Sequence, residues 1–144
     1  MHNILFVCTA NIFRSRFAEE VFNFLAIKEK IPARAFSAGL KVGEYHIRKI
    51  YKPALEQLEK LNIKPRRPNE LSLHINEVKL TKYDQLVCMD EAEHKPMVLS
   101  NPKLKDFNFE YWDIIDEPKV KSDVSLPICH NKVKELVYGL KNKT

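Results

Sequence analysis

The chemistry in this sequence is concentrated near its amino terminus, where Cys8 is followed by Arg14 and, directly after it, Ser15. A cysteine thiolate is a nucleophile, and an arginine guanidinium binds two oxygens of a phosphate or a similar oxyanion. Positive charge close to the sulfur favours the thiolate over the thiol. We therefore expect Cys8 to attack a bound phosphate ester. Ser15 is expected to donate a hydrogen bond that makes the sulfur a better leaving group afterwards.

The segment between Cys8 and Ser15 has to curl, because it joins a predicted strand to a predicted helix. Residues 4–8 are uniformly apolar, as in a buried strand, and a helical pattern begins at Ser15. A free cysteine is also common as a small core residue, but its place between strand and helix favours the chemical role. The backbone N–H groups of such a curl, together with the helix N-terminus, form a site for an anion. The residues expected to bind phosphate are Cys8, Thr9, Ala10, Asn11, Ile12, Phe13, Arg14 and Ser15.

Strands and helices alternate along the rest of the chain. The first helix has apolar residues at helical spacing and polar residues, among them Glu19 and Glu20, on the opposite face. The alternation predicts an α/β fold, a three-layer sandwich with a central four-stranded parallel sheet and helices on both faces. We expect residues 1–144 to form a single domain. Further strands are predicted at 33–39, 83–90 and 107–112, and further helices at about 53–61, 91–99 and 126–141, with Asn62 as a left-handed cap and a short helix allowed around 71–80.

Such a sheet would bring three loops of the chain together. In parallel sheets, ligands bind at the carboxyl ends of the strands, where loops lead into helices. The loops after Cys8, Ser37 and Trp112 are therefore expected to meet at one edge of the sheet.

The composition argues against several other classes of protein. The three cysteines are odd in number and widely spaced, which argues against a disulfide framework and for a reducing, cytoplasmic location. Their spacing relative to the five histidines fits no metal site, so we expect neither metal nor cofactor. The net charge of +5 comes without a nucleic-acid motif, which indicates anionic ligands in general rather than nucleic acid. The longest apolar run near the start is too short to span a membrane. We expect a monomer without membrane contact.

At these residues the sequence resembles the low-molecular-weight protein tyrosine phosphatase family. "VCTANIFRS" is similar to the C-x-x-N-x-x-R-S loop of that family, and "FSAGL", "YDQLVCMDE" and "DIIDEP" are similar to its later motifs. The resemblance covers most of the chain. It implies the fold of that family and the hydrolysis of phosphate monoesters, above all protein phosphotyrosine or small aryl phosphates, through a phosphocysteine on Cys8.

The resemblance also implies roles for individual residues. Arg14 would bind the phosphate and stabilise the transition state, and Ser15 would stabilise the thiolate. Asn11 would hold the shape of the loop in a left-handed conformation, which asparagine tolerates. Ser37 would form a hydrogen bond into the loop from the neighbouring strand. The general acid of the family, an aspartate on a late loop, best matches Asp116.

The acidic motif departs from the family pattern, because Glu117 intervenes between Asp116 and Pro118. The general acid must protonate the leaving oxygen and then deprotonate the attacking water. Asp116 keeps the spacing from Asp113, whereas Glu117 keeps the contact with the proline. We favour Asp116, with Glu117 as the alternative acid and Asp113 as a poorer third choice. A solvated acidic turn without catalytic function is the competing interpretation.

Other departures concern the surroundings of the phosphate. Phe13 stands where the family often has a second cysteine, so protection of Cys8 by a disulfide is not expected. Lys119 and Val120 replace aromatic residues that usually grip the phosphotyrosine ring. Tyr45 is the candidate for a wall of the pocket, although a loop tyrosine more often packs locally.

Two alternative functions follow from the same residues. A non-catalytic protein would bind phosphate or phosphopeptides if the altered acidic motif did not protonate leaving groups. An arsenate reductase would use Cys8 on arsenate, which mimics phosphate, but its thioredoxin-coupled form needs two further cysteines on a mobile segment. Cys88 falls within a predicted strand and Cys129 comes far later.

Overall fold

Four parallel strands form the sheet at the centre of the computed structural model, which describes residues 1–44 and 47–143. The strand order is β2-β1-β3-β4, so β1 is paired on both sides. This confirms the predicted four-stranded parallel sheet. The strands are β1 (His2–Cys8), β2 (Ala33–Gly39), β3 (Gln85–Cys88) and β4 (Glu110–Tyr111), and the helices are α1 (Arg14–Lys28), α2 (Lys52–Lys60), α3 (Glu91–Leu99) and α4 (Ser122–Lys141), with 3₁₀ helices η1 (Ile75–Glu77) and η2 (Leu80–Lys82).

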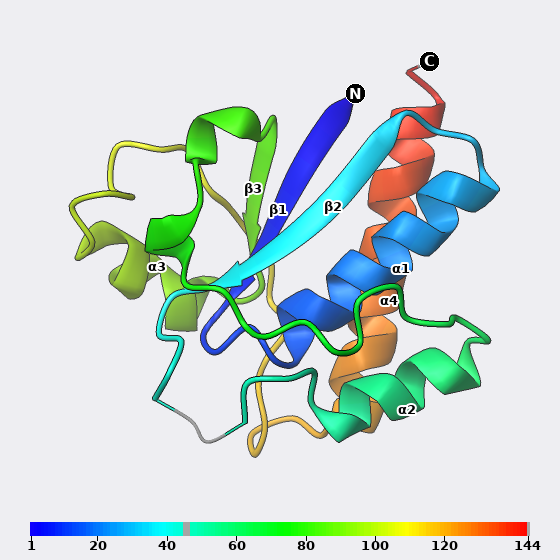
Figure 1. Cartoon of the computed structure of the whole chain (residues 1–144), viewed down its shortest axis with the longest axis horizontal. Coiled ribbons are helices and arrows are strands. Elements are labelled where there is room, and N and C mark those ends of the chain that lie inside the picture. The colour runs from blue at the N-terminus through cyan, green and yellow to red at the C-terminus, as the bar shows by residue number, and fades with distance from the viewer. Residues whose placement is uncertain (45–46, 144) are drawn as a thin grey trace.

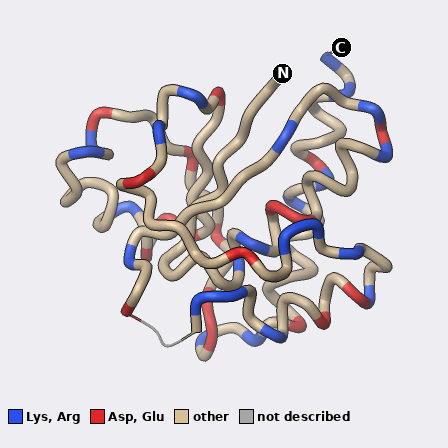
Figure 2. Tube along the Cα trace, in the orientation of Figure 1, with Lys and Arg blue, Asp and Glu red and all other residues tan. Residues whose placement is uncertain are grey.

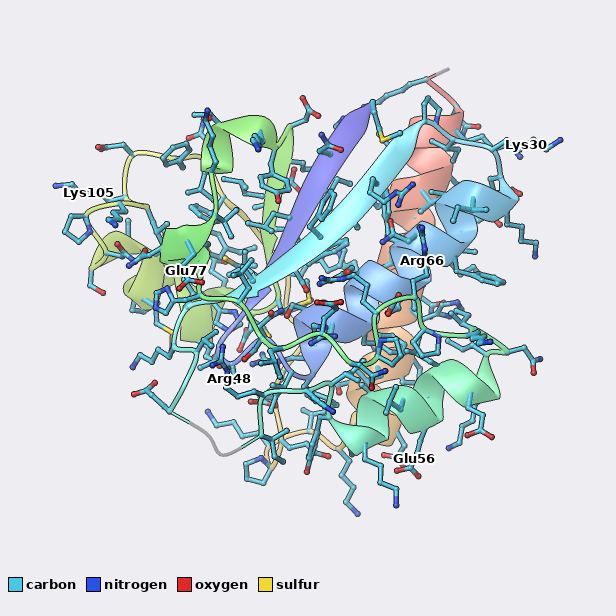
Figure 3. All side chains as sticks on the ribbon, in the orientation of Figure 1. Lys30, Arg48, Glu56, Arg66, Glu77 and Lys105 are labelled. Carbon is cyan, nitrogen blue, oxygen red and sulfur yellow. The ribbon has the colours of Figure 1, made fainter. Side chains whose placement is uncertain are left out.

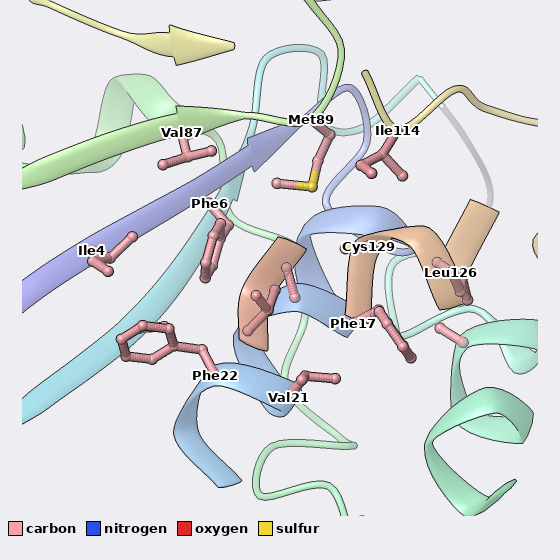
Figure 4. Close-up of a cluster of buried hydrophobic side chains, with 14 of the residues drawn as sticks. Ile4, Phe6, Phe17, Val21, Phe22, Val87, Met89, Ile114, Leu126 and Cys129 are labelled. Atoms are coloured by element: carbon pink, nitrogen blue, oxygen red, sulfur yellow. The ribbon is translucent and has the colours of Figure 1, made fainter. Parts of the chain in front are cut away.

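Helices cover both faces of the sheet, which gives the predicted three layers (Figure 1). Successive side chains of a strand point to opposite faces, so β1 contributes Ile4 and Phe6 to one core and Leu5 and Val7 to the other. The first core lies under α1, α2 and α4, and Phe6 packs there beside helix residues such as Phe22 (Figure 4). The second core lies under α3 and the 3₁₀ helices.

The polar face of α1, which was predicted to lie opposite the apolar face, is largely buried as well. The chain after α2 crosses this helix (Figure 1). The carboxylate of Glu20 accepts hydrogen bonds from the backbone N–H groups of Arg66 and Arg67, each at 3.0 Å. Glu19 forms an ion pair with the Arg67 guanidinium at 2.7 Å. Charged groups with several partners can be buried at little cost, and here they fasten a long connection to the helix.

Several predicted boundaries were wrong. The helix allowed around 71–80 is replaced by η1 and η2. The strand predicted at 107–112 pairs with β3 only at Glu110 and Tyr111. The last helix begins at Ser122, four residues before the predicted start at 126, so Pro127 lies inside it. Asn62 has φ of 59°, as predicted for a left-handed cap.

Charged side chains of both signs are interspersed along the elements (Figure 2). Lys30, Glu56 and Lys105 are exposed and project outward from the edges of the molecule (Figure 3). Among the described residues, no helix has the length and apolar character needed to cross a membrane.

Candidate active site

The segment from Cys8 to Ser15, here called the cysteine loop, turns from the end of β1 into the start of α1. Asn11 at its centre has φ of 57°, in the left-handed region. The Asn11 amide nitrogen donates to the hydroxyls of Ser15 and Ser37, both at 2.9 Å. The Asn11 side-chain oxygen accepts from the backbone N–H of Leu73 at 2.9 Å. One buried side chain therefore ties the loop to β2 and to the chain beyond α2.

Cys8 is buried, with 3% of its surface exposed, and its sulfur lies 2.9 Å from the Ser15 hydroxyl oxygen. Because that oxygen already accepts from Asn11, its own proton is free to be donated to the sulfur. A pocket of about 410 Å³ opens above the loop. Within the described chain, no group accepts a hydrogen bond from the backbone N–H groups of residues 10–14. These amides are the donors that an oxyanion in the pocket needs.

Arg14 is 1% exposed and is held by partners from two other segments. Its Nη1 donates to the Ile114 carbonyl at 2.9 Å, and its Nη2 lies 3.0 Å from a Glu93 oxygen and 3.3 Å from an Asp116 oxygen. Its Nε is buried and has no partner among the described residues. Burial opposes the charge, but the neighbouring Cys8, Glu93 and Asp116 outweigh burial and raise the pKa of Arg14.

The segment from 113 to 118, here called the acid loop, brings two carboxylates to the same pocket. Asp116 is half-buried, and its second oxygen accepts from the Glu117 backbone N–H at 2.8 Å. Burial raises the pKa of Asp116, and the charges of Glu93 and Glu117 act in the same direction, whereas Arg14 and the Glu117 backbone N–H oppose them. The Glu117 carboxylate instead accepts from the Ser122 N–H at 3.3 Å, at the start of α4. Asp113 is exposed and does not line the pocket.

A second group of polar residues lies beside Arg14, at the start of α3. The Thr9 hydroxyl donates to the Glu93 oxygen that also accepts from Arg14. The buried His94 accepts at Nδ1 from the Asp90 N–H at 3.1 Å, so its proton is on Nε2, 3.1 Å from the Thr9 hydroxyl. Burial opposes the Glu93 charge, but the donors His94, Arg14 and Thr9 hold the pKa of Glu93 well below its usual value.

A family model described as "Low molecular weight phosphotyrosine protein phosphatase" matches residues 3–142. The chain belongs to this family. It is therefore a hydrolase of the low molecular weight protein-tyrosine-phosphatase type. No curated protein matches the chain in sequence.

Solved structures with the same fold include a protein tyrosine phosphatase and an arsenate reductase. YfkJ from Bacillus subtilis has a TM-score of 0.83 at 24% identity, covering 100% of this chain and 97% of that chain. The low molecular weight protein tyrosine phosphatase from T. tengcongensis has a TM-score of 0.76 at 24% identity, covering 100% of both chains. The arsenate reductase from Archaeoglobus fulgidus DSM 4304 has a TM-score of 0.70 at 25% identity, covering 93% of this chain and 98% of that chain.

The pocket of this phosphatase has apolar and aromatic walls. Tyr51 lies edge-on to Phe13, with ring centroids 5.6 Å apart, and its N–H donates to the Ile12 carbonyl at 2.6 Å. Ile47 contributes a further side. The residue proposed from the sequence, Tyr45, lies outside the described residues.

Three of these residues were missed from the sequence, namely Tyr51, Glu93 and His94. Tyr51 immediately precedes α2 and has no spacing relation to Cys8. Glu93 and His94 carried a usable signal, because they lie in the first turn of the helix that follows β3. Parallel strands place all such turns at one edge of the sheet.

The other cysteines lie in apolar surroundings within this phosphatase. Cys88 belongs to β3, and burial raises its pKa. Cys129 belongs to α4, and burial raises its pKa to about 12. In the described parts of the chain, no three metal-ligating side chains are grouped as a metal site would require.

Proposed function

We propose that this enzyme hydrolyses phosphate monoesters, above all protein phosphotyrosine, through a phosphocysteine on Cys8. The observation that carries the proposal is the convergence of three groups on one pocket. The Cys8 sulfur, the Arg14 guanidinium and the Asp116 carboxyl all line it. They are a nucleophile, an oxyanion-binding group and a proton donor, which together suffice for phosphoryl transfer.

In the first step, the Cys8 thiolate attacks the phosphorus as the bond to the leaving oxygen breaks. Arg14 and the loop N–H groups bind the non-bridging oxygens, where charge develops in the transition state. Asp116 gives its proton to the leaving oxygen. Its raised pKa supports this role, because the acid has to be protonated when the substrate binds.

In the second step, a water molecule attacks the phosphocysteine and Asp116 accepts its proton. The sulfur–phosphorus bond breaks, and inorganic phosphate and the Cys8 thiolate result. The hydrogen bond from Ser15 stabilises the departing thiolate. The enzyme returns to its starting protonation state.

An aryl phosphate fits the walls of this pocket. Aromatic rings prefer edge-to-face or offset contacts with other rings, and Phe13 and Tyr51 already form such a pair beside the loop. Ile12 and Ile47 add apolar surface. These side chains support a flat, apolar leaving group such as the ring of phosphotyrosine.

The two alternative functions have less support. The arsenate reductase of A. fulgidus shares the fold, but thiol transfer from Cys8 needs another cysteine within reach. Cys88 and Cys129 are both fully buried in regular elements. A non-catalytic phosphate-binding role is disfavoured because Asp116 lines the pocket within 3.3 Å of Arg14.

Turnover of an aryl phosphate by purified protein tests the proposal directly. Cys8→Ser should eliminate hydrolysis, because an alcohol at this position is a far weaker nucleophile than a thiolate. Cys129→Ala, which removes a buried cysteine that does not line the pocket, should retain it. Equal rates for wild type and Cys8→Ser would reject the phosphocysteine mechanism.

The pH dependence of the same reaction identifies the general acid. Hydrolysis should fall as the pH rises through the raised pKa of Asp116, since only the protonated form can donate. Asp116→Asn should abolish this basic limb and lower kcat by about 10²–10⁴-fold. Glu117→Gln should keep the limb. The reverse pattern would assign the acid to Glu117.

A further inference from the structure

Two carboxylates meet on a single nitrogen of Arg14. Its Nη2 lies 3.0 Å from Glu93 and 3.3 Å from Asp116. We infer that Glu93 is a positioning residue of this site, which fixes Arg14 and competes with Asp116 for its guanidinium, so that Asp116 remains able to carry a proton. This inference rests on the proposed function, in which Asp116 is the general acid.

The position of Glu93 is determined by several donors at once. One of its oxygens accepts from Arg14 and from Thr9, and His94 Nε2 lies 3.3 Å from the same atom. The His94 ring is itself oriented by the Asp90 N–H. Only a quarter of the Glu93 side chain is exposed. These donors hold its carboxylate within the site, so the side chain does not extend into solvent.

Glu93 also determines which nitrogens of Arg14 face the substrate. The Ile114 carbonyl binds Nη1, and Glu93 binds Nη2. The third nitrogen, Nε, is buried without a partner among the described residues. Arg14 lines the pocket but Glu93 does not. The guanidinium is thus held from behind, with Nε available to an oxyanion in the pocket.

The charge of Glu93 acts on Asp116 through Arg14. The charged groups that act on Asp116 are Arg14 from α1, Glu93 from α3 and Glu117 from the acid loop. The Cys8 sulfur at the end of β1 lines the same pocket. Arg14 favours ionisation of Asp116. A carboxylate on the same guanidinium offsets this effect, because its negative charge opposes a second one nearby.

Glu93→Gln removes the negative charge but keeps the size of the side chain, because glutamine is nearly isosteric with glutamate and can still accept hydrogen bonds. We expect the basic limb of the pH profile of kcat/KM to move to lower pH by about 0.5–1 unit, since Arg14 would then favour ionised Asp116 more strongly. Glu91→Gln is the matched control, because Glu91 is exposed on the same helix and its one ion pair among the described residues is with Lys95. A limb that stays in place in Glu93→Gln, or moves equally in both variants, overturns the inference.

Carboxyl NMR provides a readout that does not depend on turnover. In the ¹³C-labelled wild-type protein, the Asp116 carboxyl should titrate at a higher pH than an ordinary aspartate. The Glu93 carboxyl should remain ionised over the pH range in which an ordinary glutamate becomes protonated. In Glu93→Gln, the Asp116 titration should move to lower pH. If Glu93 in the wild-type protein instead becomes protonated in the pH range of an ordinary glutamate, the inference is overturned even where the enzyme is active. Absence of hydrolysis, with these titrations as expected, overturns the proposed function alone.

The hydrogen bonds of Glu93 are tested by comparing Glu93→Ala with Glu93→Gln, since both lack the charge. Inorganic phosphate should bind more weakly to Glu93→Ala, because Arg14 then loses an anchor as well. Titration calorimetry measures the difference. Equal affinities of the two variants for inorganic phosphate would contradict the inference that Glu93 fixes Arg14.

Discussion

Asn11 connects the cysteine loop to distant parts of the chain. Its amide donates to Ser15 and Ser37, and Ser37 in turn donates to Glu19. Every hydroxyl in this series accepts one hydrogen bond and has one proton left to donate. The proton of Ser15 is thereby directed toward Cys8, so the orientation of one amide determines the hydrogen bond at the sulfur.

Asn11→Ala is expected to lower both stability and turnover. It removes three side-chain hydrogen bonds, two of them buried and one half-buried, and it puts alanine at a positive φ that asparagine tolerates better. Together these should reduce the free energy of unfolding by about 2–4 kcal/mol. Asn11→Gly keeps the backbone conformation and isolates the hydrogen bonds. Urea unfolding and kcat/KM check both variants; wild-type turnover in either would contradict a role for Asn11 in the loop.

The residues with local spacing could be predicted, and those without it could not. Cys8, Asn11, Arg14 and Ser15 lie within one turn between a strand and a helix, so their proximity follows from the sequence alone. Tyr51 reaches the same place through the packing of α2, about which single-sequence patterns are silent, whereas the place of Glu93 in the first turn after β3 was a signal that could have been used. The sequence favoured Asp116 as the general acid but left Glu117 and, less well, Asp113 open, because the choice depends on which carboxylate faces Arg14.

At the level of elements, the end of β2 and the cysteine loop are in close contact. Gly39 pairs with Cys8 in the sheet, and its N–H donates to the Leu73 carbonyl at 2.8 Å. A Cβ at Gly39 would lie 2.8 Å from the Thr9 carbonyl oxygen and 3.0 Å from the carbonyl carbon of Ala10. The second strand can therefore approach the loop only because it ends in glycine.

Gly39→Ala should displace the cysteine loop, because its nearest backbone neighbours cannot rotate away. We expect a loss of stability of about 1–3 kcal/mol and a decrease in kcat/KM. Gly139→Ala in α4 is the control, because a Cβ there meets nothing within 4 Å. It should stabilise the helix by up to about 1 kcal/mol. Thermal melts and aryl phosphate assays distinguish the two; an undisturbed Gly39→Ala enzyme would contradict the close approach.

The errors in the predicted elements have physical causes. The polar face of α1 looks solvent-exposed from its spacing, but Arg16 and Glu20 bind backbone groups of the connection around Arg67. Sequence patterns register polarity, not hydrogen-bonding partners far along the chain. Pro127 suggested a helix start because proline favours the first turn, yet α4 begins five residues before it.

For the whole molecule, the sheet separates two cores and the site lies at one of its edges. Phe6 on β1 contacts Phe22 of α1 and Trp112 after β4, so the first core reaches the segment that leads into the acid loop. The two carboxyl groups beside Arg14 have pKa values that folding shifts in opposite directions. Folding favours the ionised form of Glu93 and the protonated form of Asp116.

These opposite shifts predict opposite effects of pH on global stability. The contribution of Glu93 is present above its unfolded pKa of about 4.3 and is lost as the pH falls toward its depressed folded value. Glu93→Gln should therefore be less stable than wild type by about 1–2 kcal/mol at pH 7. This deficit should narrow below about pH 4.3.

The contribution of Asp116 to stability changes with pH in the opposite direction. Its contribution is present below its unfolded pKa of about 3.9 and is lost as the pH rises through its raised folded value. Asp116→Asn should therefore be more stable than wild type at pH 7. Urea unfolding between pH 3 and 7 measures both variants. A deficit for Glu93→Gln that does not change with pH, or a destabilised Asp116→Asn, would contradict these assignments.

The cysteine loop is continuous with the doubly paired strand β1 and with the buried helix α1. Local opening of the turn would thus have to disrupt the centre of the architecture. Catalytic inactivation and the loss of circular dichroism in denaturant should follow one curve. Turnover would then serve as a quantitative gauge of the native population, in a cell extract as well as in a cuvette.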